Sequence, residues 1–396
     1  MRSAFVPNYS ASMKITAVLA GPDNSFSVLP SWEVEGDVWF PDVERVFAGR
    51  DAYVLTCLRN EPDEITYLVT GELPPGEPAD PPVIDSVVPW AEPEWYAEAL
   101  PWIDNHLTRT GRPVQVRVWG LSNVLRVPTT DGDVYFKAHT HSSTLPPAEL
   151  PLLFANEPRL LTSLTGDVPR PLAVDEKRVW MLLPDLGSPL AAQTDIEVWT
   201  EALRSHAQLQ RSFVGRTDEL FESSCVDRRL SVLESALDRL PLATEWTEDL
   251  TPQERDRLPE RAAQLRAAIS ELAAIGVPET LLHGDLHPRN IAVRDGQVLA
   301  FDWTDAAVSH PFLDLVTFTE KRSPLSMNER VRDAYLAEWT EYAPMADLRR
   351  ALDLATQLGA LHQCVTSLHL MANVTGPDRD SMQRGATWWL KAVLAV

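Results

Sequence analysis

The N-terminal quarter of the chain alternates short apolar runs with turn-forming residues. Apolar runs at 15–19 and 26–30 flank the tetrapeptide 21–24, which reads Gly-Pro-Asp-Asn. This pattern predicts a strand, a tight turn and a second strand. Further apolar runs at 53–58 and 65–69 predict another pair of strands. A small domain that is mostly β, or α/β, is therefore expected here.

Residues 74–93 contain seven prolines. Proline fixes φ and cannot donate a ladder hydrogen bond, so this stretch is predicted to be a semi-rigid extended linker. We therefore expect an N-terminal domain over residues 1–75 and a Pro-rich linker over 76–93.

A small antiparallel sheet is predicted after the linker. The pattern first favours a helix from Glu94 to Arg109, in which Pro101 should cause a kink or a break. Alternating apolar runs then predict strands at 114–118, 124–127 and 134–138, with an Asp-Gly turn before the last of them.

The remainder of the chain is dominated by helical spacing of its apolar residues. One more strand is expected at 179–183. For the helix expected at 147–164, Pro158 predicts either a kink or a new helix that starts with Pro158 in its first turn. The predicted helices are 147–164, 195–211, 226–240, 252–275, 328–342, 346–372 and 378–394. The order is thus a small mostly-β lobe followed by a larger mostly-α lobe.

A strand-rich interruption at 281–303 carries the candidate chemistry. Asp295-Gly296 separates two apolar runs and is typical of a two-residue hairpin turn. With these residues as the loop, Ile291 should face Ala300 and Asn290 should face Phe301. The hairpin would then bring Asn290 close to Asp302, with Asp285 in the loop just before it.

These three side chains suit phosphoryl transfer. Carboxylate and amide oxygens such as those of Asn290 and Asp302 suit Mg²⁺, which takes few protein ligands and completes its shell with phosphate and water. Asp285 could accept the proton of an attacking hydroxyl. A single Asp or Asn in a loop is usually a turn former or a helix cap. All three placed around one hairpin favour the chemical interpretation.

Composition excludes several other classes of protein. The formal net charge is -22, and residues 1–100 hold 17 Asp/Glu against 5 Lys/Arg. Such a field repels phosphate polyanions, so neither nucleic acid nor an anionic membrane is an expected partner. The 3 cysteines form no CxxC pair, and no apolar run is long enough to span a membrane. A cytoplasmic location is expected, and the sequence predicts no particular oligomeric state.

The motifs in 281–315 resemble those of the aminoglycoside phosphotransferase and choline kinase-like family. Residues 283–290, His-Gly-Asp-Leu-His-Pro-Arg-Asn, resemble its catalytic loop. Residues 301–303, Phe-Asp-Trp, resemble its metal-binding segment, and 310–315 resemble the piece that follows. The resemblance covers roughly residues 112–392.

This resemblance implies a fold and a reaction. The fold is α+β, the two-lobed protein-kinase-like fold, with an N-lobe and hinge over 94–186 and a C-lobe over 187–396, in addition to the N-terminal domain. The implied reaction is transfer of a phosphoryl group from ATP, with Mg²⁺, to a hydroxyl of a small molecule. Asp285 is the implied catalytic base, and Asn290 and Asp302 are the implied metal ligands.

The resemblance also implies nucleotide-binding residues. Lys137 resembles the lysine that contacts phosphate, and Glu157 resembles its glutamate partner. Residues 181–186, with Leu182 and Leu183, resemble the hinge that binds adenine. No GxGxxG motif precedes Lys137, so Ser122 and nearby backbone N–H groups are expected to cover the phosphates.

The acceptor and two alternative functions stay open. His362, Thr366 and His369 share one face of a predicted helix, which could line the acceptor pocket or face solvent. His283 and Asp314 are interpreted as anchors of the catalytic loop. A non-catalytic pseudokinase that binds nucleotide or a partner protein is the alternative. A protein kinase is disfavoured because the glycine-rich loop and the Ala-Pro-Glu element are absent.

Overall fold

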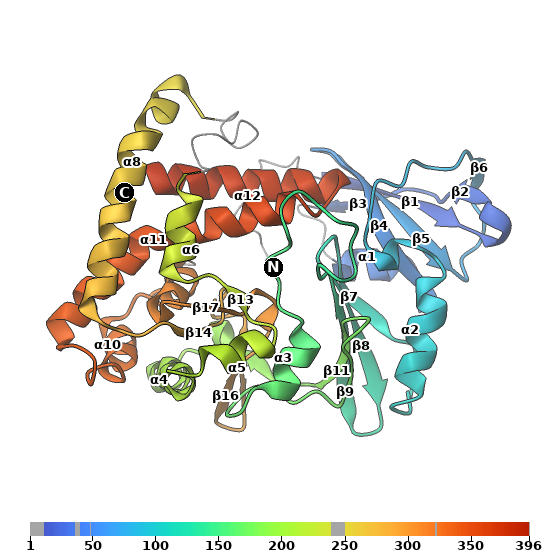
Figure 1. Cartoon of the computed structure of the whole chain (residues 1–396). Coiled ribbons are helices and arrows are strands. Elements are labelled where there is room, and N and C mark those ends of the chain that lie inside the picture. The colour runs from blue at the N-terminus through green and yellow to red at the C-terminus, as the bar shows by residue number, and fades with distance from the viewer. Residues whose placement is uncertain (1–11, 36–39, 48, 239–249, 321–322, 396) are drawn as a thin grey trace. The chain divides into compact units, whose positions relative to one another are not determined.

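The computed structural model describes residues 12–35, 40–47, 49–238, 250–320 and 323–395. Contacts divide the chain into two compact units (Figure 1). Unit 1 comprises residues 1–152, 171–185 and 370–384, and unit 2 comprises 153–170, 186–369 and 385–396.

The first sheet of unit 1 is built from the N-terminal apolar runs. Its strand order is β4-β5-β1-β2-β6, and β3 also pairs with β1. The predicted strands are all present, but β3 was missed, and β1 pairs with β5 in parallel. The helix α1 (Phe40–Phe47) precedes β4. The strands are β1 (Ser12–Ala20), β2 (Phe26–Val28), β3 (Trp32–Glu35), β4 (Ala52–Asn60), β5 (Glu64–Gly71) and β6 (Glu77–Ala79).

The proline-rich stretch 76–93 takes part in this packing. Its strand β6 pairs with β2 at the edge of the sheet, where a missing proline N–H is tolerated. A 3₁₀ turn, η2 (Pro89–Ala91), follows, and the side chains of Val88 and Trp90 lie in the hydrophobic core. Apolar residues between the prolines therefore pack into unit 1.

The second sheet of unit 1 has the order β10-β11-β9-β8-β7. It packs with α2 (Trp95–Asp104), which is shorter than the predicted 94–109 helix and contains Pro101 in its interior. Aromatic rings of Trp95, Trp102, Phe136 and Trp180 form one cluster between the helix and the sheet. The strands are β7 (Val114–Val118), β8 (Ser122–Thr129), β9 (Gly132–His139), β10 (Ala173–Asp175) and β11 (Trp180–Pro184).

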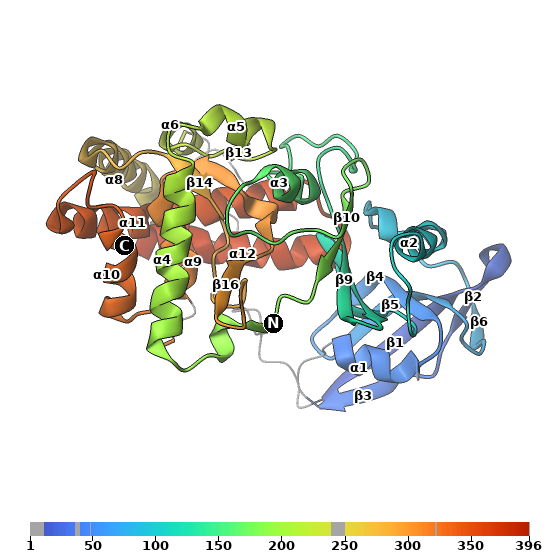
Figure 2. The same ribbon diagram turned by 90° about the horizontal axis from the view of Figure 1, so that it is seen from below.

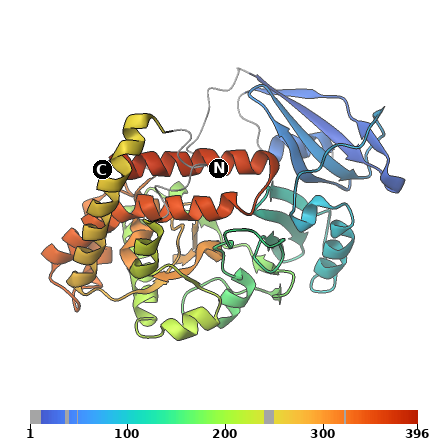
Figure 3. The ribbon, with the colours of Figure 1, turned by 45° about the horizontal axis from the view of Figure 1, so that its top comes forward.

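Unit 2 is mostly helical and holds two small sheets, β12-β15-β16 and β13-β17-β14. Figure 2 shows α4 beside α10, and Figures 1 and 3 show α11 and α12 running side by side. Its helices are α3 (Glu157–Ser163), α4 (Ile196–Ser212), α5 (Thr217–Glu222), α6 (Leu230–Ala236), α8 (Pro252–Ile275), α9 (Asp314–Glu320), α10 (Glu329–Ala337), α11 (Met345–Met371) and α12 (Gly376–Ala395), the last two extending into unit 1. Its strands are β12 (Ser188–Pro189), β13 (Val226–Asp227), β14 (Thr280–Leu282), β15 (Ile291–Arg294), β16 (Gln297–Ala300) and β17 (Ala307–Ser309).

The helix predicted at 147–164 is much shorter in the structure. Only α3 forms, and Asn156 caps it by accepting a hydrogen bond from the Arg159 N–H. Pro158 lies in the first turn, where its missing N–H costs nothing. Of the two alternatives for Pro158, the new helix start is confirmed.

Candidate active site

Residues 283–290, the predicted catalytic loop, lie between β14 and β15, and the hairpin after them has the predicted register. Asp295 and Gly296 have φ values of 51° and 80°, as a tight two-residue turn requires. Ile291 pairs with Ala300, and the Phe301 N–H donates to the Asn290 carbonyl at 2.8 Å. The turn therefore brings the start of β15 to the end of β16.

The side chain of Asn290 contacts Asp285. Its amide nitrogen donates to the Asp285 carbonyl at 3.0 Å and lies 3.5 Å from a carboxylate oxygen of the same residue. This orientation leaves the amide oxygen as the atom that can bind a cation. The Asp285 carboxylate is 42% exposed, so a substrate can reach it.

Asp302 follows β16 in a left-handed conformation, with φ 67° and ψ 59°. The next residue is held from α3, because the Trp303 N–H donates to the Glu157 carboxylate at 2.7 Å. Glu157 is fully buried. Its contact beside the proposed metal ligand was not foreseen from the sequence, because Glu157 lies far from Trp303 along the chain. The predicted pairing of Glu157 with Lys137 stays a prediction.

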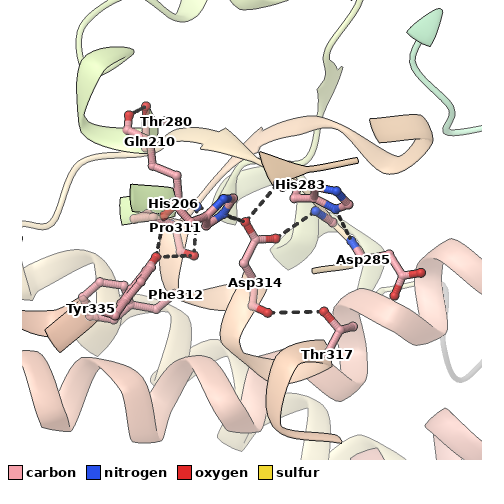
Figure 4. A network of polar contacts seen from close by, with 12 residues as sticks. His206, Gln210, Thr280, His283, Asp285, Pro311, Phe312, Asp314, Thr317 and Tyr335 are labelled. Carbon is pink, nitrogen blue, oxygen red and sulfur yellow. Dashed lines mark hydrogen bonds and ion pairs between the residues drawn. The ribbon is translucent and has the colours of Figure 1, made fainter. Parts of the chain in front are cut away.

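Asp314 holds the start of the catalytic loop, as the sequence predicted. Figure 4 shows its buried carboxylate accepting from the backbone N–H groups of His283, at 2.9 Å, and Gly284, at 2.8 Å. Nε2 of His206, at 2.8 Å, and the Gln210 amide, at 3.0 Å, complete the set. Four partners around one carboxylate fix the peptide that precedes Asp285.

His283 is an anchor of the backbone. Its Nδ1 accepts from the Asp285 N–H at 3.3 Å, and its Nε2 lies 3.0 Å from the Phe301 carbonyl, to which it donates. Burial lowers the pKa of His283, which keeps the ring neutral and suits this pair of roles. The ring thus links the catalytic loop to the end of β16.

Asp305 is a third carboxylate at the site, which the sequence motifs did not indicate. It packs against Gly284, where an added Cβ would lie 2.4 Å from the Asp305 carbonyl oxygen. Burial, together with the neighbouring charges of Asp285 and Asp302, raises its pKa to about 8. Its position three residues after Asp302 was the available signal.

Helix α11 packs against the catalytic loop. The Gln363 amide donates to the Gly284 carbonyl at 2.9 Å. His362 and Thr366 are buried, so the solvent-facing alternative is wrong for them, and His369 is partly buried. The Arg228 guanidinium donates to the His362 carbonyl and to the Thr366 hydroxyl. Burial lowers the pKa of His362 well below its usual value.

The predicted nucleotide-binding residues lie on the second sheet of unit 1. Lys137, on β9, is buried beside Val124 of β8 and Met181 of β11.

Ser122 begins β8, and its hydroxyl oxygen accepts from the Trp119 indole at 2.9 Å. Leu182 and Leu183 are buried on β11, and the Leu182 carbonyl accepts from the Leu172 N–H.

Within the described ranges, no group of three or more His, Cys, Asp or Glu side chains is arranged to hold a metal ion. Mg²⁺ needs only one or two protein carboxylates when phosphate and water supply the other ligands. Asn290 and Asp302 fit that limited role.

None of the helices described is long and apolar enough to cross a membrane.

The strand β14, the loop after it and the hairpin β15–β16 follow one another as in a kinase-like fold. The Asp285 carboxylate and the Asn290 amide lie together at the start of this hairpin. These features are typical of the phosphotransferase class of proteins. The model of the phosphotransferase enzyme family matches residues 114–348, more than half of the chain. The chain therefore belongs to this family. Its N-terminal strand-rich region precedes the matched residues. A comparison with curated protein sequences finds no match.

Solved structures show the same fold. A complex of APH(2")-IIia with GDP and kanamycin has 15% identity and a TM-score of 0.51, over 76% of this chain and 98% of that one. Macrolide 2'-phosphotransferase type I has 14% identity and a TM-score of 0.51, over 79% and 99%. Choline kinase from Cryptosporidium parvum Iowa II has 11% identity and a TM-score of 0.51, over 75% and 95%.

Proposed function

We propose that the protein transfers the γ-phosphoryl group of ATP to a hydroxyl of a small molecule. The observation that carries this proposal is the contact of Asn290 with Asp285 at the end of a hairpin that also presents Asp302. The match to a phosphotransferase family model supports it. The neighbours whose names include kanamycin, macrolide or choline support a small-molecule acceptor.

Asp285 would act as the catalytic base. Its exposed carboxylate accepts the acceptor's hydroxyl proton while the hydroxyl oxygen attacks the γ-phosphorus, and ADP leaves. The Asp314 contacts and the His283 ring hold the Asp285 backbone, so the carboxylate needs little reorganisation. Asn290 and Asp302 would hold Mg²⁺, which neutralises phosphate charge when it is bound.

The nucleotide is proposed to engage unit 1 through Lys137 and Ser122 on its phosphates and through Leu182 and Leu183 at its base. The Ser122 hydroxyl oxygen accepts a hydrogen bond from the Trp119 indole N–H. Its hydroxyl proton can therefore still be donated to a phosphate oxygen. GDP is bound in the complex of one structural neighbour, which supports nucleotide binding by this chain. GTP should therefore be tested beside ATP as the phosphoryl donor.

The acceptor is proposed to lie beside the catalytic loop and α11. The Gln363 contact with Gly284 places α11 against the loop that carries Asp285. His362 and His369 on that helix remain the proposed acceptor-side residues. The chemical class of the acceptor is a small hydroxylated molecule.

The test is an ADP-release screen across aminoglycosides, macrolides, choline-like alcohols, sugars and amino-acid alcohols. For the acceptor it identifies, Asp285→Ala should lower kcat by about 10²–10⁴-fold, because the base is lost, while ATP still binds. Asp295→Asn, in the exposed hairpin turn, is the matched control and should leave kcat unchanged. Near-normal turnover of Asp285→Ala would contradict the assignment.

The pseudokinase alternative makes a different prediction in the same experiment. It expects nucleotide binding without ADP release for any acceptor, and identical behaviour of the wild type and Asp285→Ala. Direct ATP titration alongside the screen separates the two functions.

A further inference from the structure

A carboxylate in the first turn of α12 contacts the loop between β7 and β8. The backbone N–H of Gly120 donates to the Asp378 carboxylate. Residues 119–121, here called the β7–β8 loop, lead directly into Ser122 at the start of β8. Loop and carboxylate both belong to unit 1, although α12 lies near the other end of the sequence.

The Asp378 side chain packs closely against Gly120. A Cβ added there would lie 2.9 Å from Oδ2 of Asp378 and 3.1 Å from its Cβ. Gly120 is not among the residues with positive φ, so its backbone conformation would accept any L-residue. A side chain at position 120 would therefore displace the Asp378 carboxylate.

Other groups hold the remaining parts of the β7–β8 loop. The Trp119 carbonyl accepts from the Trp90 indole at 3.1 Å, and the Leu121 carbonyl accepts from the Thr140 N–H at 3.0 Å. Asp378 provides the acceptor for the Gly120 N–H between them. These contacts together set the position from which Ser122 begins its strand.

The surroundings of Asp378 come from three strands. Arg117 on β7 attracts the carboxylate, while Cys57 on β4 and Tyr67 on β5 face it as neutral groups. Burial raises the pKa of Cys57 to about 12 and also raises that of Tyr67. Burial raises the pKa of Asp378 to about 6, against the opposing effects of Gly120 and Arg117.

We propose that Asp378 is a positioning residue that holds the β7–β8 loop so that Ser122 can bind the nucleotide phosphates. The proposal rests on the proposed function. Its consequence is that α12, outside the matched family region 114–348, controls nucleotide affinity.

The first experiment compares ATP binding and steady-state kinetics of Asp378→Ala and Asp378→Asn with the wild type. Asp378→Ala should raise the Kd and KM of Mg·ATP about tenfold, because a hydrogen bond to a charged group is lost. The acceptor KM should stay within about twofold of the wild type, since Asp378 touches no proposed acceptor group. Asp378→Asn should fall between the two, because its amide oxygen still accepts from Gly120.

The pH profile separates positioning from a general loss of structure. The ratio of the ATP KM of Asp378→Asn to that of the wild type should be largest above pH 7. It should approach one well below pH 6, where Asp378 is mostly protonated. Taking the ratio cancels titration of ATP itself. Thermal unfolding should show Asp378→Asn at least as stable as the wild type at pH 7, because a partly buried charge is removed.

Gly120→Ala supplies a second and independent variant. Alone it should raise the ATP KM, because its Cβ displaces the carboxylate. In the Asp378→Ala background it should add less than about twofold, which is the coupling expected of residues in contact. Asp380→Ala, at an exposed position of the same helix, should match the wild type.

Several results would overturn the proposal. These are an unchanged ATP constant in Asp378→Ala, tighter ATP binding in that variant, additive effects of the two substitutions, or a KM ratio independent of pH. Absence of ATP binding by the wild type would overturn the proposed function and this proposal together. If the wild type binds ATP and Asp378→Ala binds it equally well, only the positioning role of Asp378 is overturned.

Discussion

At the scale of single residues, the two proposed metal ligands differ in charge. Asp302 presents a carboxylate, whereas Asn290 presents a neutral amide whose nitrogen is already bound to Asp285. A full negative charge contributes more to the binding free energy of a divalent cation than an amide dipole does. The two residues should therefore contribute unequally to activity, although both lie at the same end of the hairpin.

Asn290→Ala and Asp302→Ala should both raise the Mg²⁺ concentration needed for half-maximal ADP release. The shift should be about tenfold for Asn290→Ala and larger for Asp302→Ala, where a charge–charge interaction is lost. Titration of Mg²⁺ at saturating nucleotide measures both. If the Mg²⁺ curves of both variants overlay that of the wild type, neither residue is a metal ligand.

Asp305 should make stability depend on pH. Its folded pKa of about 8 lies above the ordinary value for Asp, so the folded state binds more protons than the unfolded state between about pH 4 and pH 8. The free energy of unfolding should therefore fall as pH rises through this window, by at most about 1.4 kcal/mol per pH unit from this group. Asp305→Asn should flatten the slope. Denaturant unfolding from pH 5 to pH 8 tests it, and an unchanged slope would contradict the raised pKa.

At the scale of elements, the catalytic loop depends on groups from other helices. Asp314 begins α9, and His206 and Gln210 lie on α4, so both helices meet at the loop (Figure 4). The Tyr335 hydroxyl extends the network by donating to the Gln210 side chain at 2.6 Å. Helix packing is therefore coupled to the position of Asp285, the proposed catalytic base.

Asp314→Ala should destabilise the protein by about 3–5 kcal/mol, because it leaves several buried donors without an acceptor. In the part that remains folded, kcat should fall by about 10²-fold, since the loop loses its anchor. Thermal unfolding and ADP release measure the two effects. Asp353→Ala, at an exposed position on α11, is the control. A stable variant with normal kcat would show that the loop 283–290 keeps its position without Asp314.

At the scale of the whole molecule, the N-terminal strands and the second sheet share a core in unit 1. A buried polar network crosses between them. The Gln115 side chain of β7 bonds both the N–H and the carbonyl of Val54 on β4, and it also donates to the Tyr96 hydroxyl at 2.6 Å. Removing the first sheet would leave the Gln115 side chain without its two contacts to Val54.

A chain that starts at residue 94 should therefore lose stability in unit 1. It would expose apolar side chains that now face Val54 and Trp90, together with the polar side chain of Gln115. Its unfolding midpoint should fall by at least about 5 °C, or the transition should become non-cooperative. Calorimetry of this chain and of the full chain measures the difference. Equal midpoints would show that the first sheet is an independent domain.

Local sequence rules predicted several features of the site correctly. The Asp295-Gly296 turn determined the pairing of Ile291 with Ala300, because a two-residue hairpin permits one register. The positions of Asn290 and Asp302 followed from that register. The anchoring roles of His283 and Asp314 also followed, through the family motifs in which they stand.

Tertiary packing decided what neighbours in sequence could not. The predicted long helix at 147–164 was wrong, because Asn156 caps a new helix that has Pro158 in its first turn. The contact of Glu157 with Trp303 and the approach of Asp378 to Gly120 join residues far apart in the chain. No local spacing encodes such contacts.

The sequence by itself determined the kinase-like order of strands and helices, the hairpin and the chemical groups at its end, because turn geometry and short spacings act within a few residues. Only the tertiary structure decided that 76–93 packs into unit 1, and that Asp305 joins the other carboxylates. Burial and electrostatic neighbours arise when distant segments meet, and the pattern of one segment alone does not contain them.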